Sequence, residues 1–236
     1  MIKTKFAVLF CMLMPLFFSC KVQDQQAPKG AIQIDDKFDV SAVSWKGDFA
    51  DYPVGAETFY ELNYSHANLP APLNQSAKGI RISGNNHSDD LFMFLKKKVS
   101  GLAPNQQYNV KIEIELASNA SSGSFGVGGS PGESVTIKSG FTTIEPMKII
   151  DQASNHYILN VDKSNQANSG TDLKVLGNVA NGTEKNEYLL IRRSGEFTGK
   201  ADASGNAWII IGTDSGFEAT TTLYYTEVKA SITPAG

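Results

Sequence analysis

Two short polar segments hold the side chains best suited to chemistry. In the first, Gly84-Asn85-Asn86 leads into His87, Asp89 and Asp90, and an apolar run follows. An imidazole and carboxylates this close together could ligate a metal ion or contact the hydroxyl groups of a polyol. A solvated turn, in which Asn and Asp side chains bond to neighbouring backbone groups, explains the same residues without a ligand. The sequence leaves both interpretations open.

The second segment runs from Asp214 to Glu218 and lies between two apolar runs. Two carboxylates on one loop could bind Ca²⁺ or act as a general acid and a general base, and a plain hairpin loop is the alternative. Because both segments adjoin core strands, we hypothesise that they meet at one end of the fold. If the protein is an enzyme acting on cell-surface carbohydrate, its candidate catalytic residues are His87, Asp89, Asp90, Asp214 and Glu218.

Aromatic and acidic residues are interleaved in the segment that follows Trp45. An aromatic ring can stack on the C–H groups of a sugar while carboxylates and amides bind its hydroxyl groups. Some of these aromatic residues must instead fill the core, so the two interpretations compete. The candidate ligand-binding residues are Trp45, Tyr52, Asn85, Asn86, His87, Asp89 and Asp90.

Several well-known catalytic patterns do not occur in the sequence. The stretch from Gly123 to Gly132 is rich in glycine but lacks the Gly-Lys-Ser/Thr ending of a phosphate-binding loop, so it reads as a mobile loop. The chain contains no His-Glu-x-x-His motif and no recognisable Ser/His/Asp set. These observations favour a non-catalytic protein over an enzyme.

The elements that must position these residues are β-strands, because apolar residues recur mainly with a period of two. From Tyr108 to Ala117, apolar side chains alternate with Lys and Glu, which is typical of an antiparallel strand with one face in water. The run from Leu91 to Leu95 is continuously apolar and predicts a central strand. About ten strands separated by Gly, Asn and Pro turns predict a single antiparallel β-sandwich or barrel.

The N-terminal residues predict export and lipid attachment. Lys3 and Lys5 precede an apolar run from Phe6 to Phe18, which is shorter than the roughly 20 residues that span a membrane but suits a signal peptide. Leu16-Phe17-Phe18-Ser19-Cys20 resembles a lipobox, in which the cysteine receives the lipid; an ordinary secretory signal is the alternative. We therefore predict a signal peptide over 1–19, a lipidated Cys20 with a flexible tether over 20–33, and a β-sandwich domain over 34–236.

Composition sets the remaining bounds on compartment and partners. No Asp follows Cys20 directly, which favours the outer membrane of the cell envelope over the inner membrane. The formal net charge is −3, which argues against a nucleic-acid partner. Cysteine occurs only at positions 11 and 20, so the processed domain has no disulfide.

Three segments carry a resemblance to known families. Residues 99–110, with Leu102, Pro104 and Tyr108, resemble the strand–turn–strand of jelly-roll carbohydrate-binding modules and of fibronectin type III domains. Phe38-Asp39 with Trp45, and the run from Leu223 to Val228, resemble the opening and closing strands of the jelly-roll modules. Residues 84–94 and 212–218 resemble signatures of a family of bacterial secreted proteins, and that resemblance implies no activity.

The jelly-roll resemblance implies a fold, a ligand class and a metal. It implies that Asp39 and Glu227 share a structural Ca²⁺, although Glu227 stands where Asp is usual. We expect an all-β, antiparallel sandwich of jelly-roll type that is lipid-anchored and binds a glycan or polysaccharide without catalysis. A surface carbohydrate-active enzyme and a structural envelope protein without a small ligand are the alternatives.

Overall fold

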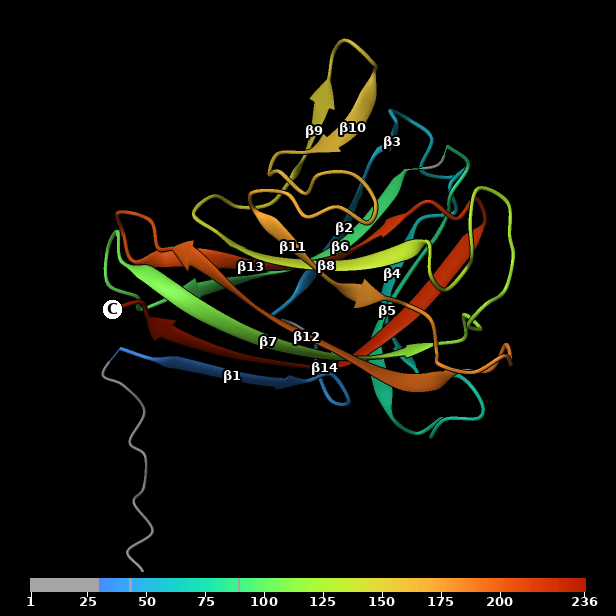
Figure 1. Ribbon diagram of the computed structural model, residues 1–236, viewed down its shortest axis with the longest axis horizontal. Helices are drawn as coiled ribbons and strands as arrows, with labels where there is room; N and C mark the ends of the chain where they lie inside the picture. Colours follow the sequence, from blue (N-terminus) through green and yellow to red (C-terminus); the bar gives the residue numbers. More distant parts are fainter. Residues whose placement is uncertain (1–29, 43, 89) are drawn as a thin grey trace, which may run out of the picture.

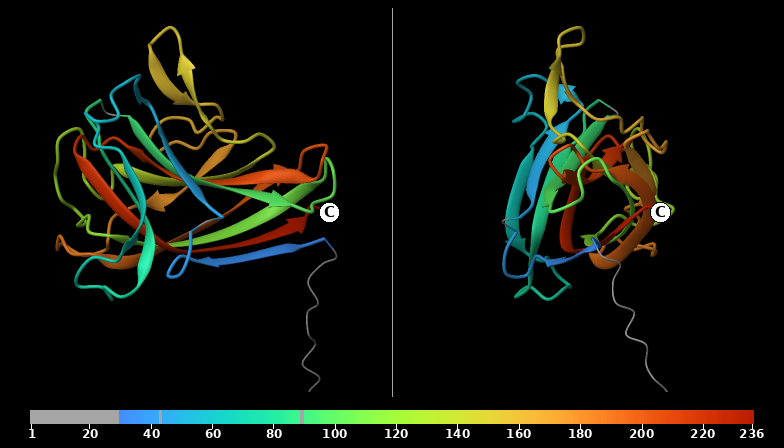
Figure 2. Two further views of the ribbon diagram at one scale, coloured as in Figure 1. Left: turned by 180° about the vertical axis from the view of Figure 1, so that it is seen from behind. Right: turned by 90° about the vertical axis from the view of Figure 1, so that its left-hand side faces the viewer.

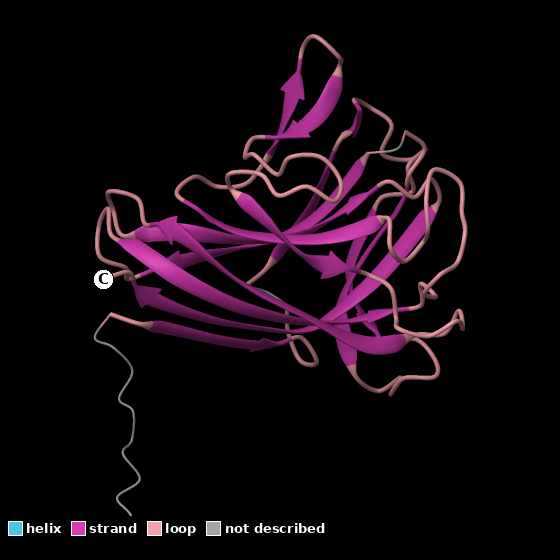
Figure 3. Ribbon diagram, viewed as in Figure 1, coloured by secondary structure: helices cyan, strands magenta, loops and turns pink. Residues whose placement is uncertain are grey.

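The computed structural model describes residues 30–236 except 43 and 89, and within these residues every regular element is a β-strand (Figure 3). Most elements match runs that the sequence predicts, because alternating apolar residues need the period-two geometry of a strand. β1 begins at Ile32, two residues inside the range assigned to the tether. The strands of the first half are β1 (Ile32–Lys37), β2 (Lys46–Ala50), β3 (Tyr52–Pro53), β4 (Asn63–Asn68), β5 (Lys78–Asn85), β6 (Leu91–Ser100) and β7 (Gln107–Ser118).

The second half of the chain continues the same pattern. Its strands are β8 (Val135–Thr142), β9 (Lys148–Asp151), β10 (His156–Leu159), β11 (Leu173–Asn178), β12 (Leu189–Lys200), β13 (Asn206–Ser215) and β14 (Thr220–Pro234).

The strands form two main antiparallel sheets that pack face to face (Figures 1 and 2). The first, sheet A, has the order β12-β7-β14-β5-β4, and β1 pairs with the distal half of β14. The second, sheet B, has the order β11-β8-β13-β6-β2. The four-strand blocks β5-β14-β7-β12 and β6-β13-β8-β11 face each other, and successive strands cross between them. This connectivity is that of a jelly roll, which confirms the predicted fold class.

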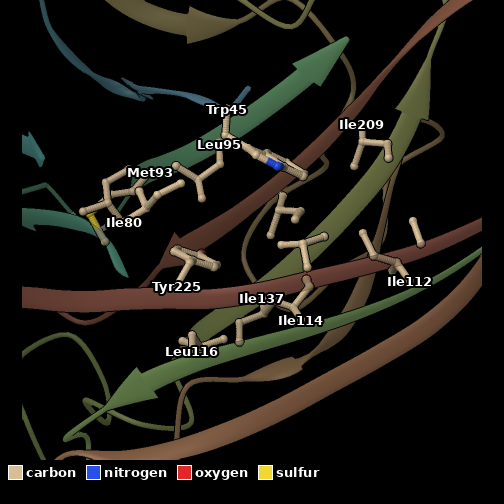
Figure 4. Close-up of a cluster of buried hydrophobic side chains, with 14 of the residues drawn as sticks. Trp45, Ile80, Met93, Leu95, Ile112, Ile114, Leu116, Ile137, Ile209 and Tyr225 are labelled. Carbon is tan, nitrogen blue, oxygen red and sulfur yellow. The ribbon is translucent and has the colours of Figure 1, made fainter. Parts of the chain in front are cut away.

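The core lies between the sheets because each strand turns alternate side chains inward. On β7, Tyr108, Val110, Ile112, Ile114 and Leu116 are buried, while Lys111 and Glu113 point outward. Figure 4 shows side chains of sheet A meeting those of sheet B across this space. The labelled residues are Trp45, Ile80, Met93, Leu95, Ile112, Ile114, Leu116, Ile137, Ile209 and Tyr225.

A second, smaller cluster covers the outer face of sheet B, the face turned away from sheet A. Phe92, Phe94 and Ile210 pack there against Leu159 and Val161 of the segment that follows β9. β10 pairs with both β3 and β9 as the middle strand of a small third sheet, and the β9–β10 hairpin projects from the body in Figure 1. The segment 143–172 therefore acts as a cover, which explains why the run from Leu91 to Leu95 is apolar on both faces.

Candidate functional site

The predicted meeting of the two polar segments is confirmed by the strand register. Asn85, at the end of β5, pairs with Thr220 at the start of β14, and Leu91, at the start of β6, pairs with Ser215 at the end of β13. The β5–β6 and β13–β14 connections therefore lie at one end of the sandwich. The connections β3–β4, β7–β8 and β11–β12 end there too, and we call this end the loop pole. The start of β1 and the end of β14 lie at the opposite pole (Figure 1).

Asn86 joins the two segments and is a structural residue. It is buried, its Nδ2 donates to the carbonyl oxygens of Ser215 (2.8 Å) and Phe217 (3.1 Å), and its Oδ1 accepts from the backbone N–H of Ser88. Its prediction as a ligand-binding residue is therefore wrong, because every polar atom of its side chain already has a protein partner. Asn85 is half-buried and donates to Glu61 Oε1 at 3.1 Å.

His87 forms an exposed platform with Phe59. Their rings are stacked with centroids 4.1 Å apart, and His87 Nε2 lies 3.1 Å from the carbonyl oxygen of Phe59. Tyr60 supports the pair edge-on, while its hydroxyl donates to Ser88 Oγ. Phe59 is 64% exposed, so one ring face of this platform is open to a ligand.

Trp45 and Tyr52, also predicted to bind ligand, are core residues. Trp45 is 2% exposed and Tyr52 is fully buried, so neither presents a ring face to solvent. The indole Nε1 of Trp45 donates to Asp36 Oδ2 at 2.8 Å, and the hydroxyl of Tyr52 accepts from Lys148 Nζ at 2.9 Å. The prediction fails because large aromatic rings contribute most when they fill the space between the sheets.

A pocket of about 280 Å³ opens at the loop pole, where β14 and β7 separate. Their pairing ends at Tyr224 and Ala117, and beyond that point the start of β14 and residues 118–120 diverge. Thr220, which lines the pocket, is the register partner of Asn85, so the pocket and the platform lie at the same pole. The lining mixes hydroxyl and amide groups with one ring and one proline: Ser118, Asn119, Ala120, Pro131, Val179, Asn186, Phe217, Thr220, Thr221, Thr222 and Leu223.

Sequence reasoning missed this pocket because no single segment encodes it. Asn186 comes from the β11–β12 connection, Pro131 from the glycine-rich β7–β8 connection and Phe217 from the β13–β14 connection. Each connection is an ordinary polar loop on its own. Only the register between the strands brings them to one place.

The predicted acidic residues Asp90 and Asp214 meet in an ion cluster beneath the cover of sheet B, where Asp214 is fully buried and Asp90 is partly exposed. Asp214 Oδ2 lies 2.7 Å from Lys138 Nζ and 2.9 Å from Lys163 Nζ. Lys163 also lies 3.0 Å from Asp51 Oδ2 and 3.5 Å from Asp90 Oδ1. Three carboxyl groups thus surround two lysines, an arrangement that no local sequence pattern indicates.

Burial shifts the protonation of this cluster. It raises the pKa of Asp90 to about 7, against the attraction of Lys163 and with the help of the nearby Asp51 and Asp214 carboxyl groups. Burial also lowers the pKa of Lys138, although its hydrogen bond to Asp214 opposes this. Burial alone would lower the pKa of Lys163, but the three carboxyl groups together raise it. Asp90 therefore holds a proton more readily than an ordinary Asp.

The five candidate catalytic residues do not form one site. Asp214 is fully buried and bonded to two lysines, so a substrate cannot reach it. His87 belongs to the platform, whereas Glu218 lies against the glycine-rich connection, where its N–H donates to the carbonyl oxygen of Val127. Asp89 lies outside the described residues. Because the Asp214 side chain is 0% exposed, it cannot form an open pair with Asp90 or Glu218 of the kind found in a glycosidase.

Asp39 and Glu227, the predicted calcium ligands, lie at one pocket, and Glu227 is paired with lysines. Both line a pocket of about 340 Å³, but Glu227 lies 2.9 Å from Lys229 Nζ and 3.6 Å from Lys37 Nζ. Ca²⁺ needs six to eight oxygen ligands, and no cluster of three or more His, Cys, Asp or Glu suited to a metal occurs in residues 30–236 outside positions 43 and 89. Calcium binding stays a prediction, and these two residues give it no support.

Comparisons with known proteins concern the fold. No protein-family model matches the chain, and no curated protein sequence matches it. Similar solved structures include the CBM22-1 xylan-binding domain of Paenibacillus barcinonensis Xyn10C, at 10% identity and a TM-score of 0.39, covering 86% of this chain and 95% of that one. A CBM4 structure matches at 10% identity and a TM-score of 0.34, covering 81% and 86% of the two chains. A putative sugar-binding protein of Bacteroides thetaiotaomicron matches at 6% identity and a TM-score of 0.40, covering 80% of this chain and 88% of that one.

At these identities and TM-scores, the similarities assign the chain neither a family nor a ligand. Cys20 and the signal peptide lie outside the described residues. Within the described part of the chain, no helix has the length and apolar character needed to cross a membrane.

Proposed function

We propose that the protein is a non-catalytic glycan-binding module whose binding surface is the loop pole. The observation that supports this most is the lining of the 280 Å³ pocket, which combines neutral amide and hydroxyl side chains with Phe217. The hydroxyl groups of a sugar can bond to the amide and hydroxyl side chains, and its C–H face can pack on an aromatic ring. The exposed Phe59–His87 platform lies at the same pole and offers a second contact for a chain of several sugar units.

We further propose that acylated Cys20 anchors the module in the outer membrane. β1 begins at the pole opposite the loop pole, so an anchor that precedes it leaves the binding surface turned away from the lipid. Labelled fatty acid should be incorporated into the wild-type chain in cells and not into Cys20→Ser. Equal labelling of the two chains would contradict the anchor and leave glycan binding untouched.

Glycan-array screening followed by calorimetry tests the binding proposal. We expect Asn186→Ala and Phe59→Ala each to weaken binding of the selected glycan by about tenfold, as expected when one central contact of an interface is lost. The control is Leu190→Ala, which removes an exposed apolar side chain from the outer face of sheet A. Repeating the measurement with a chelator tests whether glycan binding depends on calcium. Absence of binding to bacterial, plant and host polysaccharides would contradict the proposed function.

A further inference from the structure

Lys138 and Asp214 form an unusually enclosed pair on neighbouring strands. Lys138 lies directly opposite Gly212 in the β8–β13 register, so Asp214 is its diagonal neighbour on the same face. Their side chains approach to 2.7 Å, and both are 0% exposed. Gly212 has no side chain, and the ring of Phe92 fills the space that a Cβ there would take, so the covered face is closely packed beside the pair.

Burying Lys138 and Asp214 as two separate ions is unfavourable in free energy. Removing both charges from water carries a penalty that their attraction offsets only when the remaining polar atoms are satisfied. Here they are not, because Asp214 Oδ1 and Asp90 Oδ1 are both buried without a hydrogen-bond donor. Asp90 is close enough to share a hydrogen bond with Asp214, so a proton on Asp90 would satisfy the two carboxyl groups at once.

We propose that Lys138 and Asp214 are joined by an intramolecular amide bond. The Nζ lone pair attacks Cγ of Asp214, the bond from Cγ to Oδ1 breaks, and Oδ1 leaves as water. Both protons of that water come from Nζ, and Asp90 accepts and returns a proton during the transfer. No oxidant or other reactant is needed, because an ammonium and a carboxylate give one amide and one water.

Two observations on protonation favour this reaction. The lowered pKa of Lys138 makes the neutral, nucleophilic amine accessible, and the raised pKa of Asp90 keeps a proton beside the oxygen that departs. Lys163 stays charged and lies 2.9 Å from Oδ2, where it stabilises the negative charge that develops on that oxygen. The side chain of Asp90 is 44% exposed, which gives the released water a route to solvent.

The product fits the surroundings better than the ions do. Its N–H would donate to the carbonyl oxygen of Lys163, which Lys138 Nζ already contacts at 2.8 Å. Its carbonyl oxygen, the former Oδ2, would accept from Lys163 Nζ. Every polar atom of the amide then has a partner. The bond would link residues 76 positions apart in a domain whose sequence contains no cysteine after Cys20.

Peptide mapping of the full wild-type chain tests the proposal. We expect the denatured protein to be lighter than the unlinked chain by one water, and trypsin to leave Lys138 uncut because its amine is acylated. Fragmentation should show a branched peptide that joins residue 138 to residue 214. Asp90→Asn should fold and lack most of the branch, whereas Lys174→Met, which removes another lysine of sheet B, should keep it.

Three results would overturn the assignment. Trypsin cleavage at Lys138 in wild-type protein of unreduced mass would show that the pair remains ionic. A mass lower by one water, with trypsin still cutting at Lys138, would indicate a cyclic imide at an aspartate. A branched peptide that contains Lys163 instead of Lys138 would show that the amide forms at the other lysine. The wild-type measurement decides between these results even if Lys138 or Asp214 variants fail to fold.

Discussion

The outer faces of the two sheets both carry paired charges, yet they put those charges in opposite surroundings. On sheet A, Lys111 and Glu196 lie 2.7 Å apart with side chains 68% and 67% exposed. On sheet B, Lys138 and Asp214 lie at the same 2.7 Å with no exposure, beneath the cover formed by residues 143–172. Identical distances therefore describe two different interactions, because water screens the first pair and is excluded from the second.

The difference shows why the two faces suit different roles. The exposed ion pairs on sheet A add little stability, because water screens them. A covered cluster makes sheet B sensitive to the loss of any member, because each charge depends on the others. The predictions below test this contrast, beginning with the change for which we expect the largest effect.

Asp214→Ala should lower the free energy of unfolding by about 3–5 kcal/mol, the usual cost of breaking a buried pair. The substitution leaves Lys138 and Lys163 without their shared acceptor, and it also removes the proposed cross-link. Chemical denaturation followed by fluorescence measures the change. The double variant Lys138→Met, Asp214→Leu should recover part of the loss, because it leaves one fewer buried charge unpaired. A loss below about 1 kcal/mol for the single variant would mean that the cluster is hydrated.

Gly212→Ala should cost about 1–3 kcal/mol through overpacking on the same face. A Cβ at position 212 would lie 2.3 Å from Cζ of Phe92, so the ring would have to move. Adding Phe92→Leu should restore part of the stability, since the smaller side chain makes room for the methyl group. Thermal unfolding of the two variants gives the comparison, and an unchanged Gly212→Ala midpoint would show that the covered face is loosely packed.

The sequence allowed much more of sheet A than of sheet B to be predicted. On β7, the alternation from Tyr108 to Leu116 identifies both the buried face and the wet face. On β6 the run from Leu91 to Leu95 is apolar on both faces, so it predicts burial without saying what provides it. The cover comes from residues 143–172, whose short strands give no sign of where they dock. Nothing in the sequence distinguishes Lys138 and Lys163 from surface lysines; only the position of the cover shows that they are buried.

The candidate site was predictable to a similar, partial degree. The sequence indicated the importance of the β5–β6 and β13–β14 connections, because His87, Asp90 and Asp214 are concentrated there. It did not reveal that Asp90 and Asp214 turn inward while His87 stays outside on Phe59. Side-chain direction at a strand end depends on register, and register depends on partners far away in the sequence.

Asp162→Ala should cost about 1–2 kcal/mol by loosening the cover itself. The carboxylate accepts from the backbone N–H groups of Thr171 (2.7 Å) and Ser164 (2.9 Å) and from the Thr171 hydroxyl. These hydrogen bonds, chiefly from the Thr171 backbone, lower the pKa of Asp162 below its ordinary value of 3.8. The contribution is therefore complete above that ordinary pKa and is lost as the pH falls through the lower, folded-state pKa.

Asp162→Asn provides the matched control, because its amide oxygen can accept the same bonds without titrating. The stability advantage of the wild-type chain over Asp162→Asn should be present at pH 6 and shrink as the pH falls below about 4. Urea unfolding across this range measures it. An advantage that grows on acidification would contradict the assignment.

Lys111→Ala should have the smallest effect, at most about 0.2–1 kcal/mol, because its pair with Glu196 is open to water on sheet A. Lys111 and Glu196 are direct register partners on β7 and β12, so their geometry is already favourable. At 1 M salt the screening length falls to about 3 Å, and the difference from wild type should disappear. Asp214→Ala should keep nearly all of its loss at the same salt, because counterions do not enter the covered cluster. Equal salt sensitivity of the two variants would show that the cover on sheet B does not exclude solvent, and the contrast between the two faces would then fail.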